Sequence, residues 1–384
     1  MPPDRSPGPP VSFICVHAGA GYHHPRTHTA LLTLVSEACL SGMRNLLSGT
    51  TSCSAATTAT NHLESSPLTN AGLGSNLTIQ GTVECDASAM CGRTGAFGGV
   101  GAVSGIRHPI CGAVAVMRGD MQGPGICGLV PPVLLVGEGA KTFCAAQGVE
   151  IVQMRSLITD ESQTRWERHM RILREAEQQE GERAKKRQRK ECRDKSPDLS
   201  EQSFPESHLN DTVGCVAQDS TGNITSTVSS GGISLKHPGR VGEAAIYGAG
   251  TWSECTPTVS IGCSVSGTGE QIIKTLFARE CAKRCLKSDD VAESLREVIR
   301  EFLDIDLIKG KERNVGVIIY RCELTADESI GDDVDGKKYI REVWWAHTTK
   351  SFCVAWMSSA DKKPHARVST LAPGHVMVID GRPI

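Results

Sequence analysis

The sequence predicts a layered α+β fold, in which helices and strands occupy separate layers. Strand-like segments come in pairs that favour antiparallel pairing, and helical segments come in pairs between them. The chain of 384 residues is long enough for one large core or two smaller ones. With 39% hydrophobic and 22% charged residues, its composition is globular and not fibrous. We therefore expect a layered α+β or four-layer sandwich, and not a sheet of repeated βαβ units.

The first part of the chain alternates strand and helix signals. Residues 13–17 (FICVH) predict a short buried strand that runs into a glycine turn. Apolar residues three and four positions apart predict a helix over 29–47, and the small residues of 50–63 predict a second, weaker helix. Glycine-punctuated stretches at 78–85 and 95–106 favour strands and tight turns, in which another layer or a substrate approaches the backbone.

The composition changes abruptly in the middle of the chain. Residues 165–195 hold twelve Lys or Arg and seven Asp or Glu, and turn-forming residues follow. This pattern predicts a charged helix and a disordered linker. We therefore divide the chain into an α part (13–154), a charged helix with a flexible linker (155–210) that ends near a self-cleavage site, and a β part (212–384).

The β part contains most of the strand signals. Two alternating strands flank a turn at 220–223, and 259–265 predicts a third strand. Helical periods occupy 269–286 and 291–303. Three strand candidates close the chain, at 315–320, 341–347 and 351–357.

Charge and hydropathy exclude two classes of function. A net charge of -2 excludes binding of nucleic acid by bulk electrostatics, because that affinity scales with the number of phosphates that Lys and Arg neutralise. No stretch approaches the roughly 20 apolar residues that span a bilayer, and no signal-peptide pattern opens the chain. We therefore expect an unsecreted protein with no membrane partner.

The cysteines and histidines do not predict a metal site. The sixteen cysteines lie in apolar segments without a CxxC pair, which indicates reduced core residues. Cys281 and Cys285 are four residues apart but lack a second ligand pair at zinc spacing. His23 and His24 are adjacent and have no third ligand nearby in the sequence. We expect no metal.

Thr212 begins a strand directly after the polar linker, an odd place to start a core element in an intact chain. If the Asp211–Thr212 bond breaks, Thr212 gains a free α-amine, whose unperturbed pKa is about 7.7 to 8.0, beside its own hydroxyl. One residue then supplies both nucleophile and general base. On spacing alone, the alternative of an ordinary β-branched strand residue is favoured.

Five motifs in order resemble those of the type-2 asparaginase family of N-terminal nucleophile hydrolases: VHAGAGYHH, SPLTNAGLGSNLTIQGTVECDASAM, DTVGCVAQD, SSGGISLKHPGRVG and SGTGE. Within this family the chain is most similar to the threonine aspartases (taspases), because Ala18 interrupts the usual glycine pair and Asp211 precedes the nucleophile. The tail WWAHTTKSFCVAWMSS is also similar. The resemblance covers 13–151 and 211–374 and implies a four-layer αββα sandwich.

The resemblance implies roles for individual residues. It makes Thr212 the nucleophile, exposed by self-cleavage after Asp211. Ser230 corresponds to a second hydroxyl that orients the attacking oxygen. Ser266 and Gly267 correspond to the pair whose hydroxyl and backbone N–H receive the oxyanion. Asn70, which as a lone residue is more often a turn former, corresponds to an active-site asparagine whose amide adds a donor.

Arg240 and Glu243 bear on the substrate. In the small-molecule asparaginases the matching arginine binds the substrate α-carboxylate, and an acid three residues later binds the α-ammonium. A peptide cut after aspartate presents its side-chain carboxylate to the arginine and has no free ammonium. Position 243 is neither the usual aspartate nor the neutral residue expected of a taspase, and Glu243 can still reach an ammonium. L-asparaginase or isoaspartyl dipeptidase activity is therefore the alternative.

The resemblance implies an autoprocessed threonine endopeptidase that cleaves after aspartate in nuclear proteins such as transcription regulators, without a cofactor. It also implies an αβ heterodimer, with pairing of two heterodimers as a further expectation. The run from Lys185 to Arg193 resembles a nuclear-localisation segment, which predicts an import receptor as partner and a location in nucleus and cytoplasm; a solvated helix face fits the composition equally well. An inactive scaffold or nucleic-acid-binding protein is a further alternative, which Thr212, Ser230 and Arg240 disfavour.

Overall fold

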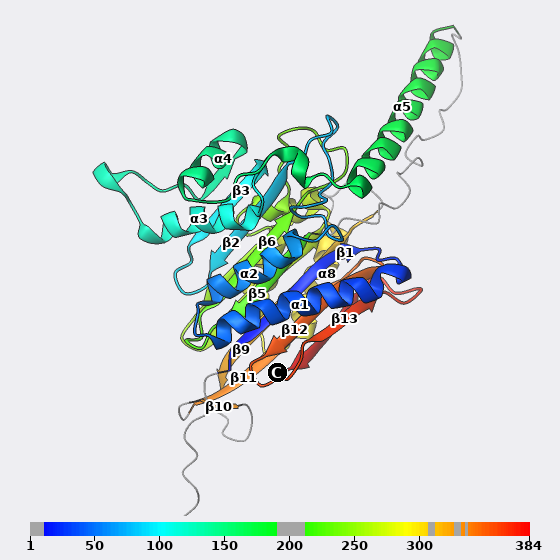
Figure 1. The fold of residues 1–384 in the computed structure, drawn as a ribbon. Coiled ribbons are helices and arrows are strands. Elements are labelled where there is room, and N and C mark those ends of the chain that lie inside the picture. Colours follow the sequence, from blue (N-terminus) through cyan, green and yellow to red (C-terminus); the bar gives the residue numbers. More distant parts are fainter. Residues whose placement is uncertain (1–10, 190–211, 306–311, 326–331, 335–336) are drawn as a thin grey trace, which may run out of the picture.

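The computed structural model describes residues 11–189, 212–305, 312–325, 332–334 and 337–384. Two sheets stack face to face, and helices cover the outer face of each (Figure 1). The protein is therefore a four-layer αββα sandwich, and the expected α+β fold is confirmed.

The first sheet has eight strands in the order β13-β12-β1-β5-β6-β2-β3-β4. Neighbouring strands are antiparallel except β3 and β4, which pair in parallel. Its strands are β1 (Phe13–Gly21), β2 (Cys85–Cys91), β3 (Phe97–Val103), β4 (Leu134–Val136), β5 (Val213–Gln218), β6 (Ile224–Ser230), β12 (Ser351–Ser358) and β13 (His365–Thr370).

The second sheet has six strands, ordered β10-β11-β9-β8-β7, with β14 also paired to β11. Its register places Gly267 opposite Val315, at the end of β8. Its strands are β7 (Thr251–Cys255), β8 (Val259–Gly267), β9 (Val315–Thr325), β10 (Asp332–Val334), β11 (Lys337–His347) and β14 (Val378–Pro383).

Helices form the outer layers. Those on the first sheet are α1 (His28–Leu47), α2 (Ser52–Glu64), α3 (Pro109–Gln122) and α4 (Gly137–Ala146), and those on the second are α7 (Phe277–Lys287) and α8 (Val291–Asp304). The short α6 (Gly269–Thr275) follows β8, and α5 (Asp160–Arg189) projects from the body (Figure 1). Short 3-10 helices are η1 (Pro25–Thr27), η2 (Ile126–Gly128), η3 (Met154–Leu157) and η5 (Glu243–Ala245).

Apolar residues fill the space between each pair of layers. One cluster joins the two sheets, with Val216, Ile318 and Trp345 among its members. Others lie between the outer helices and the sheets and contain, for example, Val35 of α1 and Phe302 of α8. Burial of these side chains is the main favourable contribution to the fold.

The α and β parts interlock within the first sheet. Strand β1, from the α part, lies between β5 and β12, which both belong to the β part. Strand β2 likewise pairs with β6. A cut before Thr212 would therefore leave the two parts joined by strand pairing and by a shared core.

Most of the expected elements are present. The helices expected at 29–47, 50–63 and 291–303 are α1, α2 and α8, and the hairpin around 220–223 is β5 and β6. The helix at 269–286 is broken at Leu276, which has a positive φ of 46°. The segment expected at 155–210 as a charged helix and linker contains α5, and its residues 190–210 lie outside the described residues.

Some sequence expectations were wrong or incomplete. Residues 78–84 form no named strand; the chain turns there, and β2 begins at Cys85. Helices α3 and α4 and strand β7 were not foreseen, and two strands, β13 and β14, follow the last strand expected. The cysteines behave as core residues: eleven of the fifteen in the described part are buried and all fifteen are unbridged, with Cys281 and Cys285 on the buried face of α7.

Helices within the described ranges fall short of the length and apolarity that a membrane crossing requires.

Candidate active site

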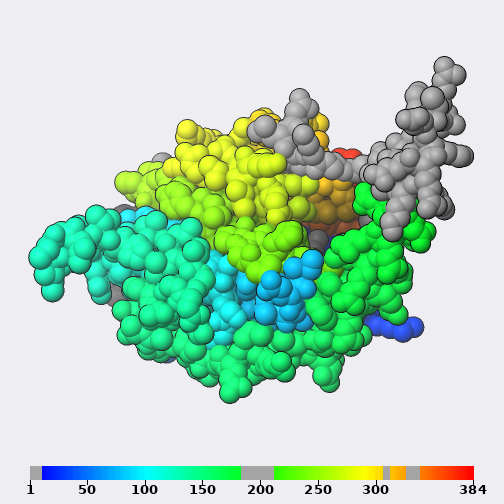
Figure 2. Space-filling model, turned by 90° about the horizontal axis from the view of Figure 1, so that it is seen from above, coloured from blue at the N-terminus to red at the C-terminus, as the bar shows by residue number. Residues whose placement is uncertain are grey.

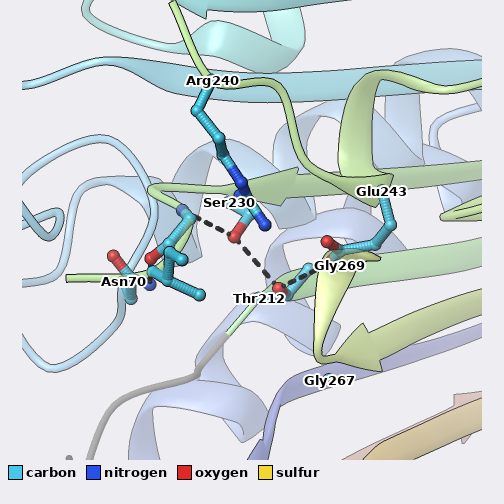
Figure 3. A pocket seen from close by; sticks show the side chains of 9 residues that line it. Asn70, Thr212, Ser230, Arg240, Glu243, Gly267 and Gly269 are labelled. Atoms are coloured by element: carbon cyan, nitrogen blue, oxygen red, sulfur yellow. Dashed lines mark hydrogen bonds between the residues drawn. The ribbon is translucent and has the colours of Figure 1, made fainter. Parts of the chain in front are cut away.

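The candidate active site is a small pocket where β5 begins and β6 and β8 end. Its lining comes from distant parts of the sequence: Asn70, Thr212, Ser230, Gly232, Ile233, Arg240, Glu243, Gly267 and Gly269 (Figure 3). Antiparallel pairing of β5 with β6 brings the start of one beside the end of the other, with Val213 opposite Ser229. The neighbouring sheet contributes the end of β8.

The hydroxyl of Thr212 lies between the side-chain oxygens of Ser230 and Glu243. Its Oγ1 lies 3.0 Å from Ser230 Oγ and 3.0 Å from Glu243 Oε1, and the residue is 2% exposed. A threonine hydroxyl has one proton to donate, and an ionised carboxylate can only accept. When Glu243 is ionised, Thr212 therefore donates to Glu243, and when Glu243 is protonated the Thr212 hydroxyl is free to donate to Ser230. The hydroxyl oxygen is then oriented by both neighbours.

Ser230 is itself held by a glycine turn. The Gly232 N–H donates to Ser230 Oγ at 3.0 Å, and Gly232 has a positive φ of 66°, which glycine adopts readily. Asn70 braces this turn from the α part: its Nδ2 donates to Gly232 O at 2.8 Å, and its backbone carbonyl accepts from Gly231 N–H at 2.6 Å. A Cβ on Gly231 would lie 2.3 Å from Asn70 Oδ1. The turn therefore requires small residues.

Glu243 is a buried acid at the start of η5. It is 3% exposed, and burial raises the pKa of its carboxyl to about 7, although Arg240 and the Thr212 hydroxyl favour the charged form. Gly269 makes room for it, because a Cβ there would lie 2.5 Å from Glu243 Oε2. Near neutral pH this carboxyl can therefore both accept and return a proton.

Arg240 points into the pocket from the opposite side (Figure 3). Its Nε donates to Glu270 Oε1 at 2.8 Å, and its Nη2 lies 2.8 Å from the same oxygen. Nη1 is buried and has no hydrogen-bond partner among the residues that the structure describes. A guanidinium held on one edge with a free Nη1 is suited to a carboxylate ligand.

Gly267 lines the pocket, whereas Ser266 does not. Gly267 has a φ of 147°, and a Cβ there would lie 2.2 Å from Asn314 O, so a larger residue does not fit. The Ser266 side chain is fully buried, and its Oγ accepts from the Ala20 N–H at 2.9 Å. The oxyanion role of this pair stays a prediction, for which Gly267 is the better placed.

A buried charge pair lies behind the pocket. Asp86 accepts from Ala102 N and Gly242 N, both at 2.8 Å, and Lys236 donates to the carbonyls of Glu84 and Gly231. Burial raises the pKa of Asp86 and lowers that of Lys236, while each favours the charged form of the other. This pair supports the backbone on both sides of the site.

The base of α5 is connected to the pocket through the side chain of Asn76. Arg165 Nη1 donates to Asn76 Oδ1 at 3.0 Å, and Asn76 Nδ2 donates to Gly232 O at 2.9 Å. Figure 2 shows the light-blue segment that precedes β2 between the green α5 and the yellow-green segment that follows β6. Asn76 thus links the charged middle segment to the turn that holds Ser230.

The structure brings together six of the residues singled out from the sequence: Asn70, Thr212, Ser230, Arg240, Glu243 and Gly267. Asp211 lies outside the described residues. The sequence analysis missed Glu270, although it lies in the SGTGE motif, because a partner for an arginine thirty positions away has no local signal. It also missed the supporting residues Asp86, Lys236, Asn76 and Arg165.

His23 is a structural residue near this region. Its Nδ1 lies 2.8 Å from Ser351 Oγ, and its Nε2 lies 3.2 Å from Ala18 O. Both ring nitrogens thus have partners that join β1 to β12.

The sequence matches a family model and is similar to several known proteins. The family model described as asparaginase matches residues 11–322. Over 276 residues the chain is 35% identical to an isoaspartyl peptidase of Salmonella typhimurium, covering 71% of this chain and 78% of that protein. It is 34% identical to an isoaspartyl peptidase/L-asparaginase of Danio rerio (70% and 74% covered) and to a plant-type L-asparaginase of Thermococcus kodakarensis (71% and 79% covered).

Proposed function

The chain belongs to the asparaginase family of N-terminal nucleophile hydrolases, and on this basis we propose that it is a threonine endopeptidase that activates itself by cleaving its Asp211–Thr212 bond. The observation that carries the proposal is the Thr212 hydroxyl at the pocket, 3.0 Å from both Ser230 Oγ and Glu243 Oε1. N-terminal sequencing of the purified protein tests it. Thr212 should be found as a second N-terminus.

In the proposed reaction, the free α-amine of Thr212 removes the proton of its own hydroxyl as Oγ1 attacks the substrate carbonyl. The Gly267 N–H stabilises the oxyanion, and the leaving amine takes the proton. An ester on Thr212 results, and water hydrolyses it with the same amine as base. Ser230 orients Oγ1 throughout.

We assign the aspartate specificity to Arg240. Arg240 lines the pocket, and its Nη1 has no hydrogen-bond partner among the described residues, so the side-chain carboxylate of a substrate aspartate would pair with it. The proposed self-cleavage site agrees with this assignment, because it also follows an aspartate, Asp211. We further propose that the substrates are nuclear regulatory proteins.

A second candidate is hydrolysis of asparagine or of isoaspartyl dipeptides, the activities named for the relatives. The observation that favours it is the Glu243 carboxylate beside Arg240, since together they suit a zwitterionic amino acid. Parallel turnover of an internal aspartyl peptide, free asparagine and an isoaspartyl dipeptide separates the two. Faster hydrolysis of either small substrate would favour this second candidate.

We propose nuclear import for the segment from Lys185 to Arg193. Helix α5, whose described backbone ends at Arg189, projects from the body, which suits recognition by an import receptor (Figure 1). Replacing the six basic residues between Lys185 and Arg193 with Ala should move a fluorescent fusion from nucleus to cytoplasm without changing peptidase activity. A fusion that stays nuclear would refute the import role.

A further inference from the structure

Self-cleavage needs a base other than the Thr212 α-amine. Before the Asp211–Thr212 bond breaks, this nitrogen belongs to a peptide bond and has no basic lone pair. The base used in substrate hydrolysis therefore does not yet exist in the precursor. The following inference rests on the proposed self-cleavage and concerns the group that replaces this amine.

Among the described residues that line the pocket, Glu243 is the one acid in contact with the Thr212 hydroxyl. The distance from Glu243 Oε1 to Thr212 Oγ1 is 3.0 Å, within the reach required of a general base. On the other side, Ser230 Oγ lies 3.0 Å from the same oxygen and accepts the Gly232 N–H. Thr212 Oγ1 is thus held between Ser230, which the Gly232 N–H fixes, and the Glu243 carboxyl that can take its proton.

We propose that the Glu243 carboxylate is the general base of self-cleavage. It takes the Thr212 hydroxyl proton as Oγ1 attacks the carbonyl carbon of Asp211. When the C–N bond breaks, the protonated Glu243 returns this proton to the leaving nitrogen, which becomes the α-amine. Asp211 is left as an ester on Thr212, and water hydrolyses this ester, so the only co-reactant is water.

The surroundings of Glu243 suit this role. Its backbone is fixed by η5 and by the Gly242 N–H bond to Asp86, and Gly269 leaves space for Oε2. Arg240 favours the ionised carboxylate, whereas Asp86 opposes it. Burial has the largest effect and raises the pKa to about 7, which makes this carboxylate a stronger base than an exposed glutamate.

The test is the rate at which freshly translated, protease-free precursor divides into its two fragments, followed by gel and intact mass between pH 5 and 9. The rate of the unaltered precursor should rise to a plateau with a midpoint near pH 7. Glu243→Gln should lower the plateau by about 100-fold or more and remove this midpoint, and Glu243→Asp should retain a carboxylate-dependent rate. Glu37→Gln, on an exposed position of α1, is the matched control, because it makes the same change away from the pocket.

Two further experiments exclude a merely structural effect. In Glu243→Ala, added formate should restore cleavage in proportion to its concentration, since it can supply the missing carboxylate. Hydroxylamine, which cleaves esters, should not accelerate the self-cleavage of the Glu243→Gln precursor, because the ester on Thr212 would form too slowly. Cleavage of Glu243→Gln at the unaltered rate, or full restoration by hydroxylamine, would overturn the proposal. Thr212→Ala distinguishes failure of the general-base proposal from failure of self-cleavage. If the Thr212→Ala precursor were still cleaved into two fragments, self-cleavage itself would be refuted.

Discussion

Arg165 and Asn76 are 89 residues apart in the sequence, yet Arg165 Nη1 donates to Asn76 Oδ1 at 3.0 Å. Asn76 in turn donates to Gly232 O, and the Gly232 N–H donates to the Ser230 hydroxyl beside Thr212. Three hydrogen bonds thus separate a helix outside the sandwich from the residue that orients the nucleophile. This connection makes Arg165 a positioning residue.

Replacing Arg165 with Met should therefore lower kcat while leaving KM nearly unchanged. We expect a loss of about 1 kcal/mol, or roughly fivefold, because one charge-assisted hydrogen bond is removed from a partly buried site. Steady-state kinetics with an aspartyl peptide provides the measurement. Arg171→Met, on an exposed position of the same helix, is the control and should match the unaltered enzyme.

Thr212→Ala should remain a single chain and be inactive. The variant keeps the strand but lacks the hydroxyl for both self-cleavage and substrate attack. Denaturing gels and peptide turnover provide the two readouts. A Thr212→Ala enzyme with substantial activity would contradict the assignment of the nucleophile.

Arg240→Lys should lower kcat/KM for an aspartyl peptide. The expected loss of transition-state binding free energy is about 2 to 3 kcal/mol. Lysine keeps the charge but loses the planar fork that pairs with a carboxylate at two points. The loss should be much smaller for a matched peptide with asparagine in place of aspartate, which has no carboxylate to bind. Equal losses on both peptides would point to a structural role.

Glu270→Gln should mainly raise KM. Glu270 contacts Arg240 at 2.8 Å and is half exposed, so the change should cost about 0.5 to 1 kcal/mol through poorer orientation of the guanidinium. The same kinetic assay measures it. An unchanged KM would show that Arg240 is held by the pocket walls alone.

His17 should make stability fall in acid. It is fully buried against Ser264, and burial lowers its pKa from 6.5 to about 3. Between these two pKa values the imidazole binds a proton in the unfolded chain but not in the folded chain. The contribution of neutral His17 to the free energy of unfolding is therefore fully present above pH 6.5 and is lost as the pH falls toward 3. His17→Gln should reduce the slope of unfolding free energy against pH by up to about 1.4 kcal/mol per unit in denaturant titrations from pH 6 to 4. A slope equal to that of the unaltered protein would refute this.

Sequence patterns predict the elements whose periodicity is strong. Helix α8 repeats apolar residues at helical spacing, with Val291, Leu295 and Val298 buried, and β5 alternates before a glycine turn. Helix α3 was missed because its glycines and small residues weaken the helical signal. Strand β13 was missed because it pairs only with β12, at the margin of the sheet, and is largely exposed. Such a strand needs no long apolar run.

The sequence by itself determined the family motifs, the α+β class and the residues to consider at the site. It also contains Glu243 where a shorter or neutral residue was expected, but the sequence does not predict which residues the Glu243 carboxyl contacts. Only the tertiary structure decided that Glu243 contacts the Thr212 hydroxyl, that Ser266 is directed away from the pocket, and that Glu270 and Arg165 support it from outside. The physical reason is that strand pairing and layer packing, and not sequence spacing, set the distances between side chains, and hydrogen bonding and burial then set their chemistry.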